Sequence, residues 1–277
     1  MVEAGDTVHY DEVTELIDLA RYPIEDLSDA VSRTFLEQCR ARLRKTGLCH
    51  LPGFVKPAAA AAMAKEGLAE LPSSYRDESR HNVYFTAQAK GLAPDHPGVQ
   101  SQRLATHTIP YDLIGAKAML RRLYHWPPLL AFVAAVLERP VLYLHGDPMG
   151  ALIVFIHGDG DQLGWHFDHA DFVTTLILQA PERGGIFEYL PNLRKPDEEN
   201  IEGIKRVLEG ADKRVVRVPS EAGSLSVFAG QHSIHRVTPT EGSRARVVAV
   251  LSYEKEPEVQ FTDEERIRFY GRSGLQT

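Results

Sequence analysis

The sequence has very little cysteine, and this excludes a fold that depends on a framework of disulfide bonds. Cys39 and Cys49 are the only cysteines among 277 residues, and they form no CxxC pair. Disulfide-stapled domains carry at least four cysteines and are usually shorter than this chain. A single disulfide is the alternative, but we expect two free thiols in a reducing compartment. The expected localisation is therefore the cytoplasm.

The sequence also lacks long apolar runs and an excess of positive charge. Its longest apolar stretch, at 129–136, is far shorter than the roughly 20 residues that cross a bilayer. Residues 1–18 lack the basic-then-apolar pattern of a secretory signal. The 31 basic and 38 acidic residues give a net charge of −7, which argues against affinity for nucleic acid through a basic surface. We therefore expect neither a membrane nor a nucleic acid as partner; the oligomeric state is not predicted.

The first half of the chain is predicted to be mainly helical. A helix over 28–45 is indicated by apolar residues four apart, with Ser28 as N-cap and Gly47 as the stop. Its predicted buried stripe consists of Leu27, Val31, Phe35, Cys39 and Leu43. A strand is expected at 48–55, and further helices at 58–69, 112–124 and 127–137. The polar stretch 72–110 is predicted to be irregular apart from a short strand at 83–85.

The second half is rich in short β-forming runs separated by glycine. Strands are expected at 141–144, 151–157, 164–167, 172–179, 185–190, 214–218, 224–228, 235–238 and 246–253, with helices at 198–208 and 263–269. Many short strands at this spacing favour a sandwich or barrel over βαβ units. We expect one domain over 1–277, in which a helical part, about 1–140, packs on a β core, about 141–277.

Twelve histidines are present, and the most informative one lies in the segment GWHFD at 164–168. In a strand, His166 and Asp168 point to one face, and Trp165 and Phe167 to the opposite, buried face. An imidazole and a carboxylate side by side can chelate a divalent metal. Two histidines and one carboxylate form the ligand set typical of non-haem Fe(II) oxygenases. The third ligand has to come from elsewhere, and His235 is the candidate.

These residues carry a resemblance to a known family. HFD at 166–168, His235 and an arginine eleven residues later resemble the Fe(II)/2-oxoglutarate-dependent dioxygenases. The segments GDQLGWHFD, TLILQAPERGGIFEYLPNLR, HSIHRVTP and RVVAVLSYEKEP, and the ending FYGR, are similar to the subgroup of free amino-acid hydroxylases and radical lysine halogenases. The similarity runs from about 144 to 272. It implies a mostly β core, a double-stranded β-helix or jelly roll, with the helical N-terminal part packed on it.

The resemblance also implies roles for individual residues. His166, Asp168 and His235 would be the iron ligands, with His232 as the rival of His235. Arg246 would bind the far carboxylate of 2-oxoglutarate, because a guanidinium pairs bidentately with a carboxylate. Arg244 has the same strand parity and is the alternative. The implied cofactors are Fe(II), 2-oxoglutarate as cosubstrate, and O2.

Three positions bear on the reaction and the cosubstrate pocket. The subgroup commonly has asparagine where this chain has Ile153, and tyrosine where it has His157. His157 is a candidate contact of 2-oxoglutarate; a satisfied core histidine is the alternative. The halogenases have glycine at the position of Asp168, which leaves an iron site for chloride. The carboxylate present here predicts hydroxylation instead.

The expected function is hydroxylation of an aliphatic C–H bond of a small substrate, a free amino acid or a derivative. Glu188, Tyr189, Arg194 and the loop 73–108 are the candidate sources of charged substrate contacts, with a solvated surface role as the alternative for each. The same iron chemistry giving desaturation or ring closure is one competing hypothesis. A non-catalytic jelly-roll metal-binding or sensor protein is another, although such a protein has no need of an arginine for the cosubstrate.

Overall fold

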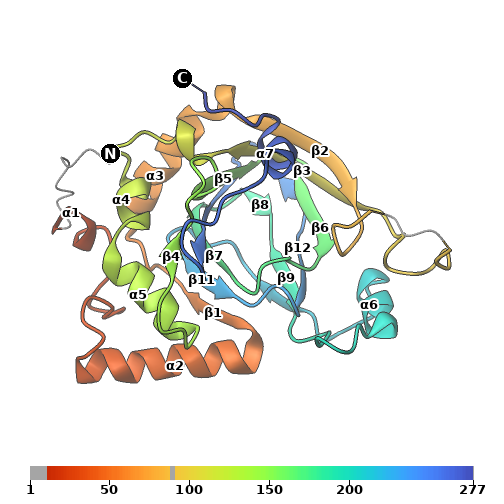
Figure 1. Ribbon diagram of the computed structural model, residues 1–277, viewed down its shortest axis with the longest axis horizontal. Coiled ribbons are helices and arrows are strands. Elements are labelled where there is room, and N and C mark those ends of the chain that lie inside the picture. Colours follow the sequence, from red (N-terminus) through yellow and green to blue (C-terminus); the bar gives the residue numbers. More distant parts are fainter. Residues whose placement is uncertain (1–10, 88–90, 277) are drawn as a thin grey trace.

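The computed structural model describes residues 11–87 and 91–276. Its centre is an antiparallel sheet that curves into a half-barrel, and the helices of the first half of the chain gather on one side of it (Figure 1). Within the described residues, the strands of the large sheet are β1 (Leu48–Leu51), β2 (Tyr75–His81), β3 (Gln102–Ile109), β5 (Leu152–His157), β6 (Gln162–His166), β7 (Val173–Gln179), β9 (Phe187–Leu190), β10 (Val216–Val218), β11 (Leu225–Phe228), β12 (Ile234–Val237) and β14 (Arg246–Leu251). Two small sheets pair β4 (Tyr143–Leu144) with β15 (Tyr253–Glu254), and β8 (Arg183–Gly184) with β13 (Thr240–Glu241).

The helices cover one face of the sheet and its open end. They are α1 (Asp11–Thr14), α2 (Ala30–Thr46), α3 (Pro57–Ala69), α4 (Met119–Tyr124), α5 (Pro127–Val136), α6 (Ile201–Leu208) and α7 (Asp263–Tyr270), with short 3-10 turns at Leu71–Ser73 and Tyr111–Leu113. The predicted fold class, a mostly β jelly-roll-like core with helices packed on it, is confirmed. In Figure 1, α2 and α5 lie below and beside the sheet, whereas α7 lies across its upper end.

The helices and the strand predicted before residue 72 and after residue 110 are present, but the prediction that 72–110 is irregular apart from a strand at 83–85 was wrong. β1 pairs with β11, and β3 pairs with β5 and β6, so the first 140 residues supply three strands to the sheet. β2 and β3 form a continuous ladder from Tyr75 opposite Thr108 to His81 opposite Gln102. β2 reads YRDESRH, and its largely exposed side chains have no apolar alternation. Backbone pairing rather than burial therefore stabilises this hairpin, and hydrophobic periodicity cannot reveal it.

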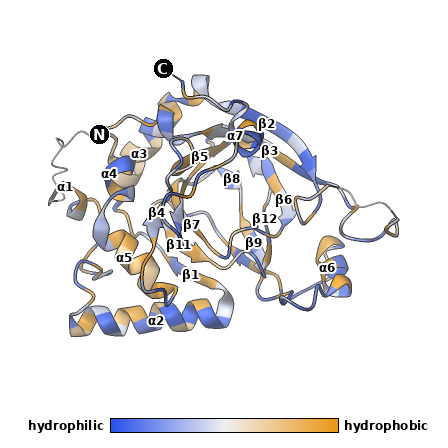
Figure 2. Cartoon of the chain, in the orientation of Figure 1, coloured by the Kyte–Doolittle hydropathy of each residue, from blue (hydrophilic) through white to orange (hydrophobic). Residues whose placement is uncertain are grey.

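Helix α2 differs from its prediction in its N-cap and its buried stripe. Asp29 rather than Ser28 caps it, accepting from the backbone N–H groups of the next turn. Val31 is 66% exposed, while Leu36 and Cys39 are buried. The helix is rotated this way because it packs on α5, where the ring of Phe35 stacks on that of Phe132 at 5.8 Å. The hydrophobic colouring of α5 in Figure 2 agrees with its place between α2 and the sheet.

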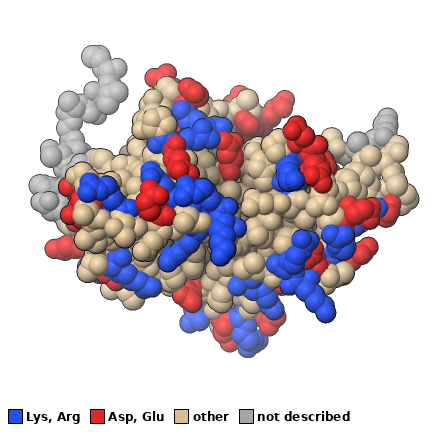
Figure 3. Space-filling model, turned by 90° about the horizontal axis from the view of Figure 1, so that it is seen from below, with Lys and Arg blue, Asp and Glu red and all other residues tan. Residues whose placement is uncertain are grey.

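Other local predictions hold. The C-terminus of α2 has Gly47 in the left-handed region at φ 69°, as its predicted stop requires. Cys39 and Cys49 are both free and buried. None of the helices within the described ranges is long and apolar enough to cross a membrane. On the face shown in Figure 3, basic side chains gather near the centre with acidic ones among them, so the net charge of −7 is not a uniformly negative surface.

Candidate active site

Three potential metal ligands meet at the end of β6. His166 on β6 lies opposite His235 on β12 in the antiparallel ladder, and Asp168 follows two residues after His166. The Oδ1 atom of Asp168 lies 3.5 Å from Nε2 of His166 and 3.4 Å from Nε2 of His235. One ligand atom from each residue falls within 4.8 Å of the others, and no other group of three or more histidine, cysteine or acidic side chains among the described residues does so. His166 and Asp168, which were predicted to point to the same face of the strand, do point to the same site.

The backbone decides which nitrogen of each histidine faces the site. Nδ1 of His166 lies 2.8 Å from the carbonyl oxygen of Gly164, and Nδ1 of His235 lies 2.9 Å from that of Ser233. A carbonyl oxygen only accepts, so each Nδ1 carries the proton and donates. Each Nε2 is therefore left with a free lone pair directed at Asp168. Such a hydrogen bond from the far nitrogen is the usual support of a metal-binding histidine.

The electrostatics of the cluster suit a cation. Burial by itself raises the pKa of Asp168, but His235 and His166 beside it hold that pKa well below its usual value. Burial, and then the neighbouring His235, lower the pKa of His166, so its imidazole stays neutral. A neutral imidazole and an ionised carboxylate are the forms that bind a divalent metal.

Aromatic rings enclose the cluster. The ring of Phe228 is 4.8 Å from that of His235, and the ring of Phe85 is 5.1 Å from that of His166. On the other side of β6, Trp165 and Phe167 are buried, as predicted, against α6 and the chain after β9. The ligand atoms thus lie on a strand that is anchored by a hydrophobic cluster and have little freedom to move.

A buried arginine without an acidic partner lies deeper in the half-barrel. Arg246 begins β14, is 5% exposed, and donates from Nε to the Ser220 hydroxyl at 3.0 Å. No carboxylate of the described residues lies within ion-pair distance of its guanidinium, and burial lowers the pKa of Arg246 to about 10. Gly185 supplies the space, because a Cβ on it would meet Cδ of Arg246 at 3.2 Å. An uncompensated buried cation is costly, so this pocket suits an anionic ligand.

His157 lies directly opposite Arg246 in the β5–β14 ladder. It is buried, and its Nδ1 has no hydrogen-bond partner among the described residues. Burial, and then the charge of Arg246, lower the pKa of His157 to about 3, so the ring is neutral at pH 7. The structure therefore places both predicted cosubstrate residues side by side.

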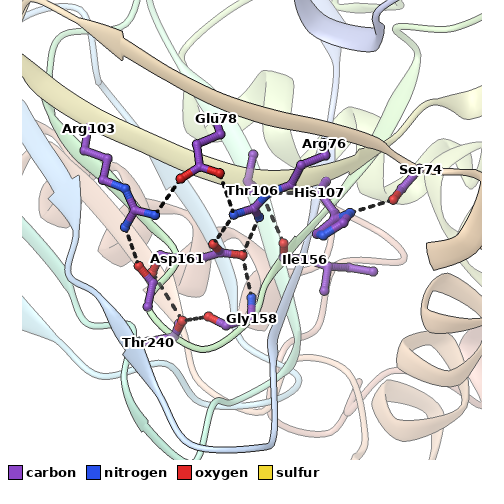
Figure 4. A network of polar contacts seen from close by, with 11 residues as sticks. Ser74, Arg76, Glu78, Arg103, Thr106, His107, Ile156, Gly158, Asp161 and Thr240 are labelled. Carbon is purple, nitrogen blue, oxygen red and sulfur yellow. Dashed lines mark hydrogen bonds and ion pairs between the residues drawn. The ribbon is translucent and has the colours of Figure 1, made fainter.

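A polar network holds the turn between β5 and β6 (Figure 4). Asp161 accepts two hydrogen bonds of 2.7 Å from the guanidinium of Arg76 on β2 and one of 2.9 Å from the backbone N–H of Gly158. Thr240 donates from its backbone N–H to the carbonyl oxygen of Asp161 at 2.9 Å. The turn joins the strand of His157 to the strand of His166, so this network fixes one relative to the other.

The alternatives raised by the sequence lie elsewhere. His232 is not part of the ligand cluster, and Arg244 is exposed and donates to the backbone carbonyls of Ala180 and Pro181. Glu188 is buried but paired with Arg217 at 3.1 Å and Arg236 at 2.7 Å. Tyr189 is buried and packs on Phe228 in a small hydrophobic cluster.

A cavity of about 500 Å³ opens beside Asp168. Arg194, which the sequence named, lines it together with Tyr84, Glu199 and Gln231, which the sequence did not. Tyr84 lies within the stretch 73–108, where substrate contacts were expected. Glu199 is five residues after Arg194, a spacing that carries no signal outside a helix.

The sequence of the chain matches a family model over most of its length. Residues 31–268 match the family described as Halogenase D. None of the curated proteins compared with the chain matches it.

Three solved structures with a similar fold are described as α-ketoglutarate-dependent or as complexes with α-ketoglutarate or 2-oxoglutarate. The carbocyclase SnoK from nogalamycin biosynthesis, a non-haem α-ketoglutarate-dependent enzyme, is 12% identical with a TM-score of 0.58, covering 87% of this chain and 93% of that one. The epimerase SnoN in complex with Fe3+, α-ketoglutarate and nogalamycin RO is 19% identical with a TM-score of 0.54, covering 80% and 84%. HygX from Streptomyces hygroscopicus, with nickel and 2-oxoglutarate bound, is 15% identical with a TM-score of 0.54, covering 81% and 89%. The fold is therefore that of the 2-oxoglutarate-dependent oxygenases.

Proposed function

We propose a function for this chain from the premise that it belongs to the Halogenase D family. The chain is a non-haem Fe(II)- and 2-oxoglutarate-dependent oxygenase that hydroxylates an aliphatic C–H bond of a free amino acid or a close derivative. The observation that carries the proposal is a pair of sites in one half-barrel: the convergent Nε2, Nε2 and Oδ1 atoms of His166, His235 and Asp168, and the buried, unpaired guanidinium of Arg246.

Each part of the site has a defined task. His166, His235 and Asp168 would hold Fe(II), and three protein ligands would leave coordination positions for other ligands. Arg246, oriented by the Ser220 hydroxyl that accepts from its Nε, would bind the far carboxylate of 2-oxoglutarate, and neutral His157 would offer it a further hydrogen bond. When bound, iron and 2-oxoglutarate supply the oxidising power for C–H cleavage, with O2 as oxidant and succinate and CO2 as products. The rings of Phe85 and Phe228 exclude water around the histidine ligands.

Asp168 favours hydroxylation over halogenation in this family. Its carboxylate contacts both histidines and so occupies the position that a halide would need. The two imidazoles hold the pKa of Asp168 below its usual value, which favours the anionic carboxylate. The expected products carry one added oxygen and no halogen.

The first prediction tests the two sites together. Under anaerobic conditions with Fe(II), we expect addition of 2-oxoglutarate to produce a weak metal-to-ligand charge-transfer band. Arg246→Ala should raise by about tenfold or more the 2-oxoglutarate concentration at which the band reaches half its maximal intensity. The reason is that the substitution removes a charge-assisted contact worth about 1.5–3 kcal/mol. Fe(II) binding itself should be unchanged, since Arg246 is not a metal ligand.

The matched control is Arg244→Ala, two residues earlier on the exposed surface. If Arg244→Ala weakens the binding of 2-oxoglutarate and Arg246→Ala does not, the cosubstrate does not bind at Arg246. Absence of the band in a protein that binds Fe(II) overturns the cosubstrate assignment. His166→Ala and Asp168→Ala should each abolish succinate formation, and full activity in both would discard the ligand set.

A further inference from the structure

The ligand Asp168 lies beyond the end of the strand that leads to it. β6 ends at His166, so Asp168 is two residues past the last pair of the ladder. The backbone N–H of Phe167, between these two ligands, donates instead to the carbonyl oxygen of Val83 at 2.8 Å. Val83 belongs to a turn at 82–86. This turn therefore takes the place of a neighbouring strand for the segment that carries the carboxylate.

Asn82 holds the turn 82–86 together with four hydrogen bonds. Its Oδ1 accepts from the backbone N–H groups of Tyr84 at 3.0 Å and Thr86 at 3.3 Å. Its Nδ2 donates to the carbonyl oxygens of Thr86 and Gly98, both at 2.9 Å. The residue is buried, and both polar atoms of its amide are used to the full. A buried polar network in which every member is satisfied makes the local structure rigid and unique.

Phe85 has a backbone conformation that bulky residues rarely adopt. Its φ is 53°, in the left-handed region. A conformation of this kind persists only where the surrounding structure imposes it, and it is most frequent at functional sites. Here Asn82 binds the backbone on both sides of Phe85 and so imposes it. The result is that the ring of Phe85 meets the imidazole of His166, with the ring centroids 5.1 Å apart.

The turn contacts the ligand segment on both of its faces. His166 and Phe167 point to opposite faces, and each meets one aromatic ring of the turn. Phe85 contacts His166, whereas the ring of Tyr84 stacks on that of Phe167 at 6.1 Å with an interplanar angle of 11°. The carbonyl oxygen of Tyr84 also accepts from Nε2 of His169 at 3.0 Å. The residues immediately before and after the carboxylate ligand are thus both bound to the turn.

The ring of Phe85 is supported from its other sides as well. The imidazole of His81 stacks on it at 4.1 Å with an interplanar angle of 20°. The guanidinium of Arg268, on α7, lies over it at 5.4 Å. Nδ1 of His81 in turn donates to the carbonyl oxygen of Asn82 at 2.9 Å. Packing on several sides therefore opposes movement of the ring away from the metal ligand.

We infer that the turn 82–86 is a positioning element for the metal centre, in which Asn82 fixes the backbone and Phe85 contacts a ligand ring. The inference rests on the proposed function, because it assumes the ligand set proposed there. The turn fixes the peptide that precedes Asp168, and with it the direction of the carboxylate. It also fixes the plane of the His166 imidazole. Without it, the ligand atoms would no longer be held in one arrangement before the metal binds.

The first test removes the hydrogen bonds of Asn82. Asn82→Ala should weaken Fe(II) binding by about 10- to 100-fold in anaerobic calorimetry, the usual effect of losing a group that orients metal ligands. In the metal-free protein, the amide hydrogen of Phe167 should exchange about tenfold or more faster, because its acceptor on Val83 is released. At saturating Co(II), the visible absorption spectrum, which reports the number and geometry of the ligands, should differ from that of the parent protein.

The second test separates the ring from the backbone. Glycine adopts a φ of 53° without steric cost, so Phe85→Gly keeps the conformation of the turn and removes only the ring. The exchange of the Phe167 amide should therefore remain as in the parent protein, whereas the Co(II) spectrum should change. This variant also keeps the inference testable if Asn82→Ala does not fold.

The matched control is Asn200→Ala, at the start of α6. Asn200 has the same φ of 53°, accepts from the N–H of Gly203 at 3.1 Å and donates to the carbonyl oxygen of Leu193 at 2.9 Å. Its loss should lower stability but leave the Co(II) spectrum and the exchange of the Phe167 amide unchanged.

The outcomes distinguish this inference from the proposed function. A parent protein that binds neither Fe(II) nor Co(II) refutes the proposed ligand set itself. If the parent protein binds metal, and Asn82→Ala and Phe85→Gly both keep its Fe(II) affinity and its Co(II) spectrum, the turn does not position the ligands. The same conclusion holds if Asn200→Ala changes the spectrum as much as Asn82→Ala does, because the change then reports a general loss of stability.

Discussion

Gly230 lies against the carboxylate of Asp168, and its missing side chain leaves the room that this carboxylate occupies. A Cβ built on Gly230 would collide with Oδ2 of Asp168, and the backbone carbonyl of Gly230 accepts from the backbone N–H of Asp168 at 3.3 Å. The orientation of Asp168 is thus set by a residue more than sixty positions later in the chain.

Gly230→Ala should weaken Fe(II) binding by about 10- to 100-fold, the usual effect of disturbing a group that orients a metal ligand. The added methyl displaces the Asp168 carboxylate from the two histidines. Anaerobic calorimetric titration with Fe(II) measures the effect. Gly115→Ala is the matched control, because a Cβ there has no heavy atom within 4 Å. Equal affinities for the two variants would show that Asp168 does not need this space.

At the scale of elements, the turn between β5 and β6 depends on a contact between residues 85 positions apart. Arg76 lies on the polar strand β2, and its two hydrogen bonds to Asp161 join that strand to the turn (Figure 4). The side chain of Asp161 is only 6% exposed, whereas that of Arg76 is 36% exposed, so solvent screens part of the attraction.

Asp161→Asn should lower the free energy of unfolding by about 2 kcal/mol, because it removes a charge-assisted bidentate contact and leaves the guanidinium of Arg76 only its 3.8 Å contact with Glu78. Urea denaturation measures the loss. Glu78→Gln, which alters an exposed carboxylate of the same network, should stay within about 0.5 kcal/mol of the parent protein. If the two variants are equally stable, the contact between Arg76 and Asp161 does not stabilise the turn between β5 and β6.

At the scale of the whole molecule, several histidines are neutral because they are buried. Burial is the main cause that lowers the pKa of His50, His81, His107, His125, His145 and His157. The lowered pKa is about 4 for His81 and about 3 for His157. Unfolding returns each ring to a pKa near 6.5, so the unfolded chain binds more protons below that pH.

The free energy of unfolding of the metal-free protein should therefore fall as the pH drops below about 6.5. The histidine contribution is complete above the unfolded pKa and is lost progressively toward the folded values. Denaturation midpoints between pH 7 and about pH 5 measure the slope. His157→Gln should reduce the slope of stability against pH, whereas His169→Gln, at an exposed position, should leave this slope unchanged. A midpoint that is constant across this range contradicts the prediction.

Much of the site could be predicted because it depends on local periodicity. Strand alternation is enough to place His166 and Asp168 together and to bury Trp165 and Phe167 behind them. The second-half strands likewise follow from apolar runs between glycines. The resemblance to the dioxygenases named His235, Arg246 and His157, and the structure brings the first beside His166 and the other two beside each other.

The polar features could not be predicted, because they depend on contacts between distant segments. The β2–β3 hairpin has no apolar pattern, since its stability comes from backbone pairing at a solvated edge. The rotation of α2 that exposes Val31 is decided by packing on α5.

The sequence by itself determined the strand alternation that brings His166 and Asp168 together, the β-rich core and the net charge of −7, and it predicted the free cysteines. Tertiary structure alone decided that Arg246 has no acidic partner, that Gly230 makes room for Asp168, and that Arg194 and Glu199 share a cavity with it. The physical reason is that backbone periodicity acts over two to four residues. Whether a buried charge has a partner, and whether two segments lie in close contact, depend instead on the tertiary fold, which brings together residues that are far apart in the chain.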